Sequence, residues 1–352
     1  MLIYYIFIFF FAILSSIDSW GIKNNQKKIL VNLISGCLIL FAGLRLDNAD
    51  YDVYSEAYLT ISNGEFVISD MGFNLILYLL NFISDLPITM FLVIAYTSVC
   101  INFNSFKKYS PYIFTTILLY FVHNFVLKEM IQIRAGLASS ICLYSLRYLV
   151  KEDYKKTIWA WILALSIHST TIIFGIFILI YKLKPSRTTI ISVLILCLII
   201  GHLFPFGSII KSLSDIESYS TRLAAYVMYG DSGYASKLGV FTNINTVKSL
   251  ILCFFFLIVY NRFSRKFIYF KPMFLSYTIG LCWLICFNDF AIIGARMSNI
   301  LMCGEPILLA LPFSIFKRSS RIVYAFAIIV FSCLIFYYNI GESKVIPYNF
   351  YF

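Results

Sequence analysis

The sequence predicts an all-α, polytopic integral membrane protein with about twelve membrane segments. Three observations support this fold class. Hydrophobic residues make up 61% of the 352 residues and charged residues only 13%, against about 25% charged residues in soluble domains. Apolar stretches of a length that crosses a bilayer recur along the whole chain. Basic residues gather in the short segments between these stretches, as they do in cytoplasmic loops.

Ten apolar stretches have the length and composition expected of a spanning helix: 2–18, 29–46, 87–106, 111–127, 131–150, 188–206, 246–261, 270–288, 291–316 and 321–338. The stretch 157–181 predicts either one long helix or two short helices meeting at His168. The segment 72–84 is too short to cross and ends at Ser84-Asp85-Leu86-Pro87, which is typical of a helix stop and restart. We expect it to be a half-helix on or dipping into one membrane surface.

Loop charge predicts the side of the membrane on which each loop lies. The loops 19–28, 107–110, 147–156, 182–187, 262–271 and 317–321 hold 19 of the 28 Lys and Arg, with Asp18, Glu152 and Asp153 as their acids. If these loops are cytoplasmic, the net charge of +11 divides into +16 inside and −5 outside. This alternation requires 157–181 to be a hairpin with His168 at its outer tip. We therefore expect a single membrane domain, residues 1–352, with extracytoplasmic loops at about 47–71 and 207–245.

The same counts exclude several classes of function. A soluble enzyme or a secreted domain could not bury so many apolar side chains, and the basic excess is explained by topology, so no nucleic-acid partner is expected. The nine cysteines lie in apolar stretches without zinc spacing. The sequence also lacks a P-loop, GxSxG and HExxH. Neither a metal nor another cofactor is therefore expected.

Nearly every unusual polar residue falls on the predicted outer side, which predicts a water-accessible cavity there. In the first group, Arg45, Asp50 and Asp52 lie among tyrosines. If 50–60 is helical, Tyr51, Tyr54 and Tyr58 share one face. Carboxylates beside tyrosines suit carbohydrate binding. A solvated acidic loop with tyrosines at the membrane interface explains the spacing equally well.

The second group opens the stretch 131–150. Lys128, Glu129, Gln132 and Arg134 lie close together at the expected start of a helix. Such a helix N-terminus with adjacent Lys and Arg suits an anion, although a cation near lipid headgroups is the alternative. His168 stands among Ser and Thr residues and could accept a proton near neutral pH, unless it is an ordinary packed histidine.

Two later groups complete the candidates. Within 207–245, an aromatic and arginine face is predicted, and this loop is long enough to cover a cavity; its residues are Tyr219, Arg222, Tyr226 and Tyr229. Further along, Arg296 and Glu305 follow Asn288-Asp289. They form either a buried ion pair or another wall of the cavity with a phosphate ligand.

The order of these motifs resembles the EpsG/Wzy group of O-antigen and exopolysaccharide polymerases. The resemblance covers roughly residues 40–180 and, more faintly, Arg296–Pro306. It rests on Gly43-x-Arg45-x-Asp47-x-x-x-Tyr51, Gly72-Phe73, Ile133-Arg134-x-Gly136-Leu137-Ala138 and His168-Ser169. Two positions depart from the family pattern. Ala135 follows Arg134 where Gln is frequent, and Ala49 stands where Gly is usual. Neither departure removes a candidate catalytic side chain.

The resemblance implies a glycosyltransferase of GT-C-like architecture in the bacterial inner membrane, with its active site facing the periplasm. Its substrate would be oligosaccharide units carried on undecaprenyl pyrophosphate, and its partners membrane lipid and a polysaccharide chain-length regulator. The growing chain would leave its pyrophosphate and be captured by a hydroxyl of the newest unit.

This chemistry assigns a role to each candidate. Pyrophosphate needs cations, and the candidates are Lys128, Arg134, Arg222 and Arg296. The candidate bases are His168, Asp50, Asp52 and Glu129, with His168 and Asp50 preferred. The candidate sugar ligands are Arg45, Tyr51, Tyr54, Gln132, Tyr219 and Tyr226.

Two other functions stay open. An O-antigen ligase shares the substrate and the side of the membrane but transfers the polymer to lipid A core. A lipid-linked oligosaccharide flippase would also need an arginine-lined cavity. It should, however, carry charges along its full depth, and many transporters show internal repeats, which this sequence lacks.

Overall fold

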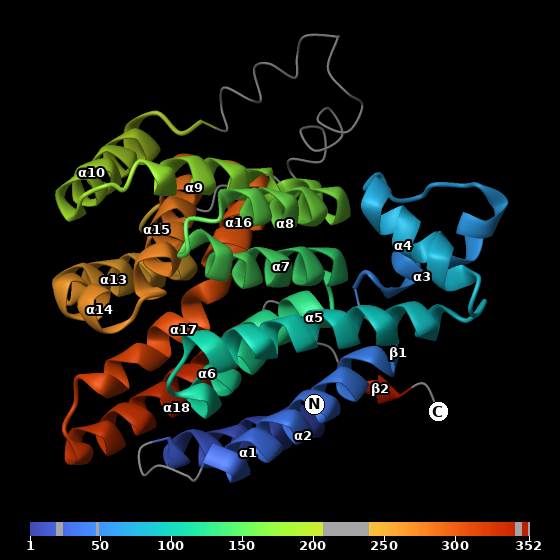
Figure 1. Ribbon diagram of the computed structural model, residues 1–352, viewed down its shortest axis with the longest axis horizontal. Coiled ribbons are helices and arrows are strands. Elements are labelled where there is room, and N and C mark those ends of the chain that lie inside the picture. Colours follow the sequence, from blue (N-terminus) through green and yellow to red (C-terminus); the bar gives the residue numbers. More distant parts are fainter. Residues whose placement is uncertain (19–23, 47–48, 207–238, 342–346, 351–352) are drawn as a thin grey trace. The chain divides into compact units, whose positions relative to one another are not determined.

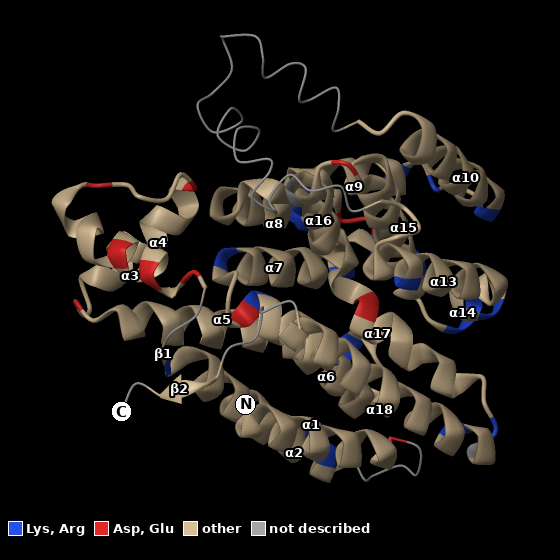
Figure 2. Cartoon of the chain, turned by 180° about the vertical axis from the view of Figure 1, so that it is seen from behind, with Lys and Arg blue, Asp and Glu red and all other residues tan. Residues whose placement is uncertain are grey.

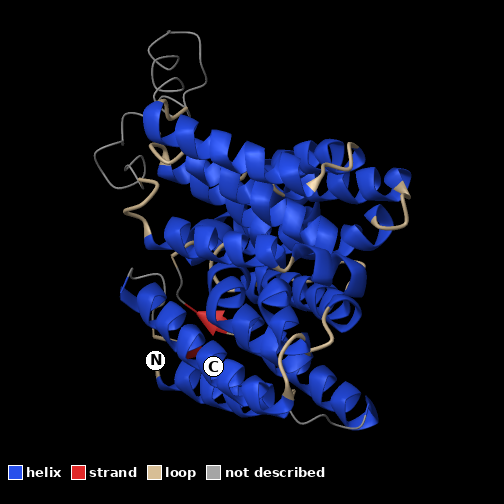
Figure 3. Ribbon diagram, turned by 90° about the vertical axis from the view of Figure 1, so that its left-hand side faces the viewer, coloured by secondary structure: helices blue, strands red, loops and turns tan. Residues whose placement is uncertain are grey.

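The computed structural model describes residues 1–18, 24–46, 49–206, 239–341 and 347–350. The described chain is nearly all helical, with two short strands (Figure 3), which confirms the all-α prediction. It divides into two compact units. The first comprises Met1–Arg147, Tyr154–Ser169 and Glu305–Phe352, and the second comprises Tyr148–Asp153 and Thr170–Gly304. The predicted tyrosine and arginine face at residues 219–229 lies outside the described residues.

The first unit contains most of the candidate residues. Its main elements, labelled in Figure 1 except for η2, are α1 (Leu2–Ile17), α2 (Asn24–Gly43), β1 (Arg45–Leu46), α3 (Tyr51–Thr60), α4 (Met71–Asn81), α5 (Pro87–Tyr109), α6 (Ile113–Leu119), the π-helix η2 (Tyr120–Glu129), the greater part of α7 (Ile133–Leu149), α8 (Tyr154–Ile167), α17 (Glu305–Ala310), α18 (Arg318–Gly341) and β2 (Asn349–Phe350). β1 and β2 pair antiparallel, with Arg45 opposite Phe350.

The second unit is built around α15 (Phe270–Cys286), which packs most extensively against three other helices of this unit. These are α10 (Arg187–Leu203), α13 (Ile244–Ile258) and α16 (Ala291–Leu301), and α15 also contacts α9 (Ile172–Lys182) and α14 (Tyr260–Lys266). Gly201 of α10 lies so close to the backbone of Ile285 that a Cβ would not fit. The Asn288 amide donates hydrogen bonds to the backbone carbonyls of Gly201 and Ile285, each at 2.7 Å.

Several helices have the length and composition of membrane spans. Four qualify by themselves: Asn25–Gly43, Pro87–Tyr109, Ile293–Ser314 and Ser319–Gly341. The pair Ile244–Ile258 and Tyr260–Lys266 qualifies as one span bent by 72°. Other predicted spans correspond to shorter helices, such as Leu2–Ile17 and Phe270–Cys286. The chain is thus a multi-pass membrane protein by helix length and composition, and the count of twelve segments stays a prediction.

The predicted half-helix is present. α4 has 11 residues and is about 17 Å long at 1.5 Å per residue, well short of the roughly 30 Å hydrocarbon core. The chain restarts as a helix at Pro87, the first residue of α5, where a proline is tolerated because its missing N–H needs no partner.

The stretch 157–181 is broken at His168. α8 ends at Ile167, a short 3₁₀ turn covers Ser169–Thr171, and α9 begins at Ile172. Of the two arrangements that the sequence left open, the chain adopts two short helices meeting at His168.

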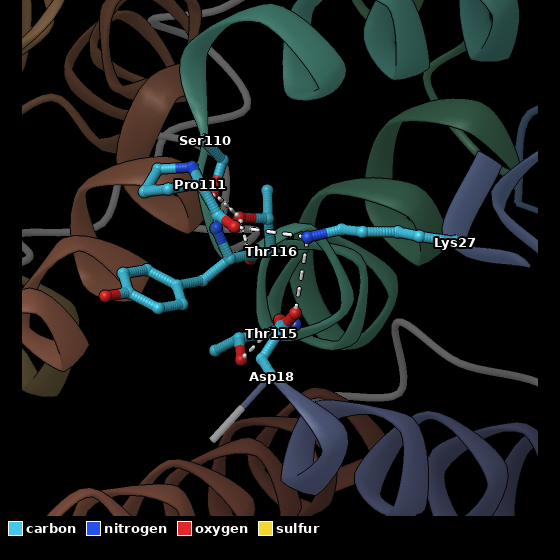
Figure 4. A network of polar contacts seen from close by, with 7 residues as sticks. Asp18, Lys27, Ser110, Pro111, Thr115 and Thr116 are labelled. Carbon is cyan, nitrogen blue, oxygen red and sulfur yellow. Dashed lines mark hydrogen bonds and ion pairs between the residues drawn. The ribbon is translucent and has the colours of Figure 1, made fainter. Parts of the chain in front are cut away.

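A polar network joins three helices of the first unit at the start of α6 (Figure 4). The Asp18 carboxylate, just after α1, accepts hydrogen bonds from the backbone N–H of Thr115 at 2.9 Å and from its hydroxyl at 3.2 Å. Lys27 of α2 lies 3.8 Å from Asp18 and donates to the Pro111 carbonyl at 3.2 Å. A carboxylate at a helix N-terminus binds otherwise unpaired N–H groups. The network therefore fixes where α6, and with it η2, begins.

Candidate functional site

Three charged or titratable side chains of the first unit meet at the N-terminus of α4. A nitrogen of Arg134, in the first turn of α7, lies 2.5 Å from Oδ2 of Asp70. Nδ1 of His168 lies 3.7 Å from the same oxygen. The other oxygen of Asp70 accepts a hydrogen bond from the backbone N–H of Ser169 at 3.1 Å. We call these three residues the Asp70–Arg134–His168 cluster.

Close packing of α4 on α8 brings this cluster together. A Cβ on Gly72 would collide with Ser166, so only glycine lets the first turn of α4 lie directly against the last turn of α8. The Asp70 carbonyl accepts from the N–H groups of Phe73 and Asn74, which begins the helix at this residue. The backbone thus holds Asp70 at the start of α4, while its carboxylate contacts Arg134 and the Ser169 N–H.

The cluster is partly open to its surroundings. The Arg134 side chain is 23% exposed and the His168 side chain 12%, whereas Asp70 is 6% exposed. The Arg134 guanidinium lies 5.6 Å from the Tyr54 ring centroid and 5.9 Å from that of Phe73. It also donates to the Tyr54 hydroxyl at 3.4 Å. Two rings and a carboxylate therefore hold a cation that a ligand can still reach.

The electrostatics of Asp70 favour its charged form. Burial by itself would raise the pKa of the Asp70 carboxyl, but the nearby His168 imidazole, the Arg134 charge and the Ser169 N–H hold this pKa below its usual range. A carboxylate beside a histidine holds the orientation of the ring. Because Nδ1 is turned toward Asp70, Nε2 is the nitrogen suited to exchange a proton with a substrate.

A second polar group, the Glu129 cluster, lies in the interior. Oε1 of Glu129 accepts from the Tyr120 hydroxyl at 2.9 Å and from the Asn102 amide at 3.0 Å, and Oε2 accepts from the Ser98 hydroxyl at 2.5 Å. All four side chains are buried, and Glu129 is 2% exposed.

The π-helix creates the Glu129 cluster. Nine residues make two and a half turns of an α-helix, which would put Tyr120 and Glu129 on opposite faces. The wider turns of η2 return them to the same face. From α18, Asn339 donates to the Val122 carbonyl within η2 at 3.0 Å, so a neighbouring helix supports the altered backbone.

Two predicted ligands also lie in the interior. Arg45 is 1% exposed, donates to the carbonyls of Ala42 at 2.6 Å and Glu129 at 3.2 Å, and lies 4.8 Å from the Phe91 ring centroid. Lys128 is 6% exposed and reaches the Ser139 hydroxyl at 3.4 Å. Lys128 and Glu129 end η2, whereas α7 begins at Ile133. Of Lys128, Glu129 and Arg134, only Arg134 therefore lies in the first turn of α7.

The predicted helix at 50–60 is present as α3, and its tyrosines pack inward. The Tyr51 ring stacks on Phe91 at 4.9 Å, and the Tyr58 hydroxyl donates to the Ser84 carbonyl at 2.6 Å. Tyr54 contacts Arg134. Of the carboxylates in this region, Asp50 precedes α3 and is half-buried, whereas Asp52 is exposed in its first turn.

The remaining candidates lie elsewhere. Gln132 is half-buried before α7, and its carbonyl accepts from the Gly136 N–H. Arg296 is exposed on α16, in the second unit. Tyr219, Arg222 and Tyr226 fall outside the described residues. Within the described ranges, no group of three or more His, Cys, Asp or Glu is arranged to hold a metal ion.

Asp70 is the site residue that the sequence analysis missed. Its signal is an aspartate directly before the half-helix that begins at Met71-Gly72, a position that favours aspartate for helix capping alone. Only its contacts with Arg134 and Ser169, from distant parts of the chain, distinguish it from an ordinary cap.

Comparison with known proteins identifies the family of this chain. The chain is 26% identical over 326 residues to the amylovoran biosynthesis protein AmsC of Erwinia amylovora, which covers 87% of this chain and 85% of AmsC. No solved structure matches the chain. The EpsG family matches residues 28–350, a range that includes Asp70, Arg134 and His168. The chain therefore belongs to the EpsG family.

Proposed function

We propose that this protein is a polysaccharide polymerase, a glycosyltransferase that joins oligosaccharide units carried on undecaprenyl pyrophosphate at the periplasmic face of the bacterial inner membrane. Membership of the EpsG family and the similarity to a protein of amylovoran biosynthesis support the polymerase role. The observation that carries the proposal is the Asp70–Arg134–His168 cluster, in which a reachable cation lies beside an oriented imidazole.

The proposed reaction is a displacement at the anomeric carbon of the growing chain. A hydroxyl of the acceptor unit forms the new bond to this carbon, and the bond from the carbon to the pyrophosphate oxygen breaks. Arg134 stabilises the negative charge that develops on the departing pyrophosphate. His168 takes the hydroxyl proton on Nε2, and Asp70 stays ionised and stabilises the imidazolium. The glycosyl–pyrophosphate bond is already activated, so the step needs no ATP.

Other predicted residues take supporting roles in the proposal. Arg222 and Arg296 are proposed as further pyrophosphate ligands, and Asp50 and Asp52 are the alternative bases. The buried positions of Arg45, Lys128 and Glu129 favour roles in holding η2 against its neighbours rather than in touching substrate. The proposal keeps the GT-C-like architecture of about twelve segments and a chain-length regulator as partner. O-antigen is the product we propose.

The test is deletion of the gene in a polysaccharide-producing host, with the lipopolysaccharide examined on a gel. Loss of a polymerase leaves core that bears one repeat unit. Loss of a ligase leaves bare core with polymer still on its carrier. A ladder of normal length would contradict the proposal. The Arg134→Ala variant, checked for normal abundance in the membrane, should fail to restore polymer in the deletion strain, so that the core still bears one repeat unit.

A further inference from the structure

α4 has two apolar faces with different surroundings. Phe73, Leu77 and Leu80 are buried against the rest of the first unit. The opposite face is exposed, by 82% at Met71, 58% at Leu75, 47% at Tyr78, 56% at Leu79 and 74% at Phe82. These five positions follow the helical spacing i, i+4, i+7, i+8 and i+11, so they form one continuous surface along α4. We call it the α4 stripe.

The α4 stripe has a fixed place beside the candidate site. It begins at Met71, the residue after Asp70. The buried face of the same helix carries Phe73, whose ring lies 5.9 Å from the Arg134 guanidinium. The contact between Gly72 and Ser166 fixes the first turn of α4 on α8. The apolar surface and the cation are thus parts of one packed arrangement.

The charged residues around α4 indicate which kind of molecule could bind the α4 stripe. Residues 46–106 contain seven carboxylates, at Asp47, Asp50, Asp52, Glu56, Glu65, Asp70 and Asp85, and no Lys, Arg or His. Figure 2 shows acidic residues on α3 and next to α4, with no basic residue on either helix. Helices that bind anionic membrane surfaces use Lys and Arg beside their apolar face. The α4 region lacks this feature, whereas Arg134 places a positive charge near the first turn of α4, beside Asp70 and Phe73.

We propose that the α4 stripe binds the polyprenyl tail of the lipid-linked donor whose pyrophosphate is bound at Arg134. A molecule with a diphosphate joined directly to a long, uncharged hydrocarbon chain offers two phosphates to Arg134 and one chain to the apolar surface, whereas a phospholipid offers one phosphate that is separated from its two acyl chains by glycerol. The inference rests on the proposed function and adds to it a surface that selects donors by the length of their lipid.

The test compares two donors that share the same sugars and pyrophosphate but carry an undecaprenyl tail or a tail of two isoprene units. The full-length protein is assayed in detergent micelles. In the wild type, KM should be lower for the long-tailed donor. The double variant Leu75→Ser/Leu79→Ser should raise KM for the long-tailed donor about tenfold, since two apolar side chains leave its binding surface. KM for the short-tailed donor and kcat for both donors should not change.

The matched control is Val53→Ser/Leu59→Ser on α3, where the side chains are 49% and 53% exposed. It should leave both KM values unchanged. Equal changes for the two donors in the stripe variant, or no change for either, would overturn the inference. Failure of the wild type to elongate either donor would instead overturn the proposed function, and the inference with it.

A second measurement needs no destabilising change. A photoreactive amino acid in place of Leu75 should crosslink to radiolabelled undecaprenyl donor, and one in place of Leu59 should not. Excess unlabelled long-tailed donor should compete, and excess phospholipid should not. Crosslinks at position 75 only to phospholipid, to a second copy of the chain or to another protein would overturn the inference.

Discussion

The Glu129 cluster and the Asp70–Arg134–His168 cluster both contain a carboxylate, but they differ in what surrounds it. Glu129 is held by the uncharged side chains of Ser98, Asn102 and Tyr120 and is 2% exposed. Asp70 contacts a guanidinium and an imidazole whose side chains are 23% and 12% exposed. A carboxylate with buried neutral donors is suited to hold helices together. One paired with accessible Arg and His can bind charge and move a proton.

The largest expected effect is the loss of activity on removal of Arg134, the cation that the Asp70–Arg134–His168 cluster has and the Glu129 cluster lacks. Arg134→Ala should lower the polymerisation rate about 100- to 1,000-fold, because the departing pyrophosphate loses its charge stabilisation. Arg134→Lys should restore part of the rate, since it returns the charge without the planar fork. Arg147→Ala, near the other end of the same helix, is the control and should keep normal turnover per folded molecule. Turnover of a purified lipid-linked donor measures the rate of all three variants. A normal rate in Arg134→Ala would show that Arg134 is not part of the site.

The second prediction compares the removal of each of the two carboxylates, Asp70 and Glu129. Asp70→Asn should lower kcat about 100-fold, because the imidazole loses its partner, and should lower the melting temperature only slightly at neutral pH. Glu129→Leu should lower the melting temperature more than Asp70→Asn does. Three buried donors lose their acceptor at a cost of about 1–3 kcal/mol, while the rate per folded molecule stays within about threefold of the wild type. Melting and turnover of both variants in the same detergent measure this contrast. The reverse pattern would exchange the roles that we assign to the clusters.

The third prediction concerns the packing that assembles the open cluster. Gly72→Ala should lower activity about tenfold, since the added methyl overlaps Ser166 and displaces α4. The double variant Gly72→Ala/Ser166→Gly should recover part of the activity, because the overlap with the Ser166 side chain is removed while the 2.8 Å contact with the Ser166 backbone carbon remains. Gly36→Ala, where the added Cβ meets no atom within 4 Å, is the control. Equal losses in the single and double variants would show that this contact does not place Asp70.

The smallest expected effect is a dependence of stability on pH. The pKa of Asp70 lies below its usual range in the folded protein, so the unfolded chain binds a proton first as the pH falls. The stability that Asp70 contributes is therefore fully present above the ordinary carboxyl pKa of about 4 and is lost as the pH falls through the lower folded-state value. The difference in melting temperature between wild type and Asp70→Asn should shrink over this acidic range. A constant difference from pH 7 to pH 3 would contradict this.

Features set by neighbouring residues could be predicted from the sequence. The stop and restart at Ser84–Pro87, the helix at 50–60 and the break at His168 each follow from local composition and spacing, and the structure contains all three. The pairing of Asp70 with Arg134 joins residues 64 positions apart, which helical periodicity cannot reveal. Periodicity also placed Tyr51, Tyr54 and Tyr58 on one face without showing that the face packs inward.

Glu129 shows a second limit of local reasoning. It lies five residues before Arg134, and the sequence analysis assigned it to the same site. The π-helix directs its side chain into the interior, toward Tyr120. Nothing in the composition of Tyr120–Glu129 signals such a wide helix, because its support comes from distant residues such as Asn339.

The π-helix also affects how relatives should be aligned. Its turns hold more residues than α-helical turns over the same rise, so the segment Tyr120–Glu129 accommodates length that an ordinary helix would exclude. A relative shorter by a single residue here and wound as an ordinary α-helix would place its glutamate about 80° around the helix from its tyrosine. In this family, an alignment gap between Leu119 and Met130 therefore indicates that the buried hydrogen bonds of the glutamate differ. A gap in a surface loop changes only the length of that loop.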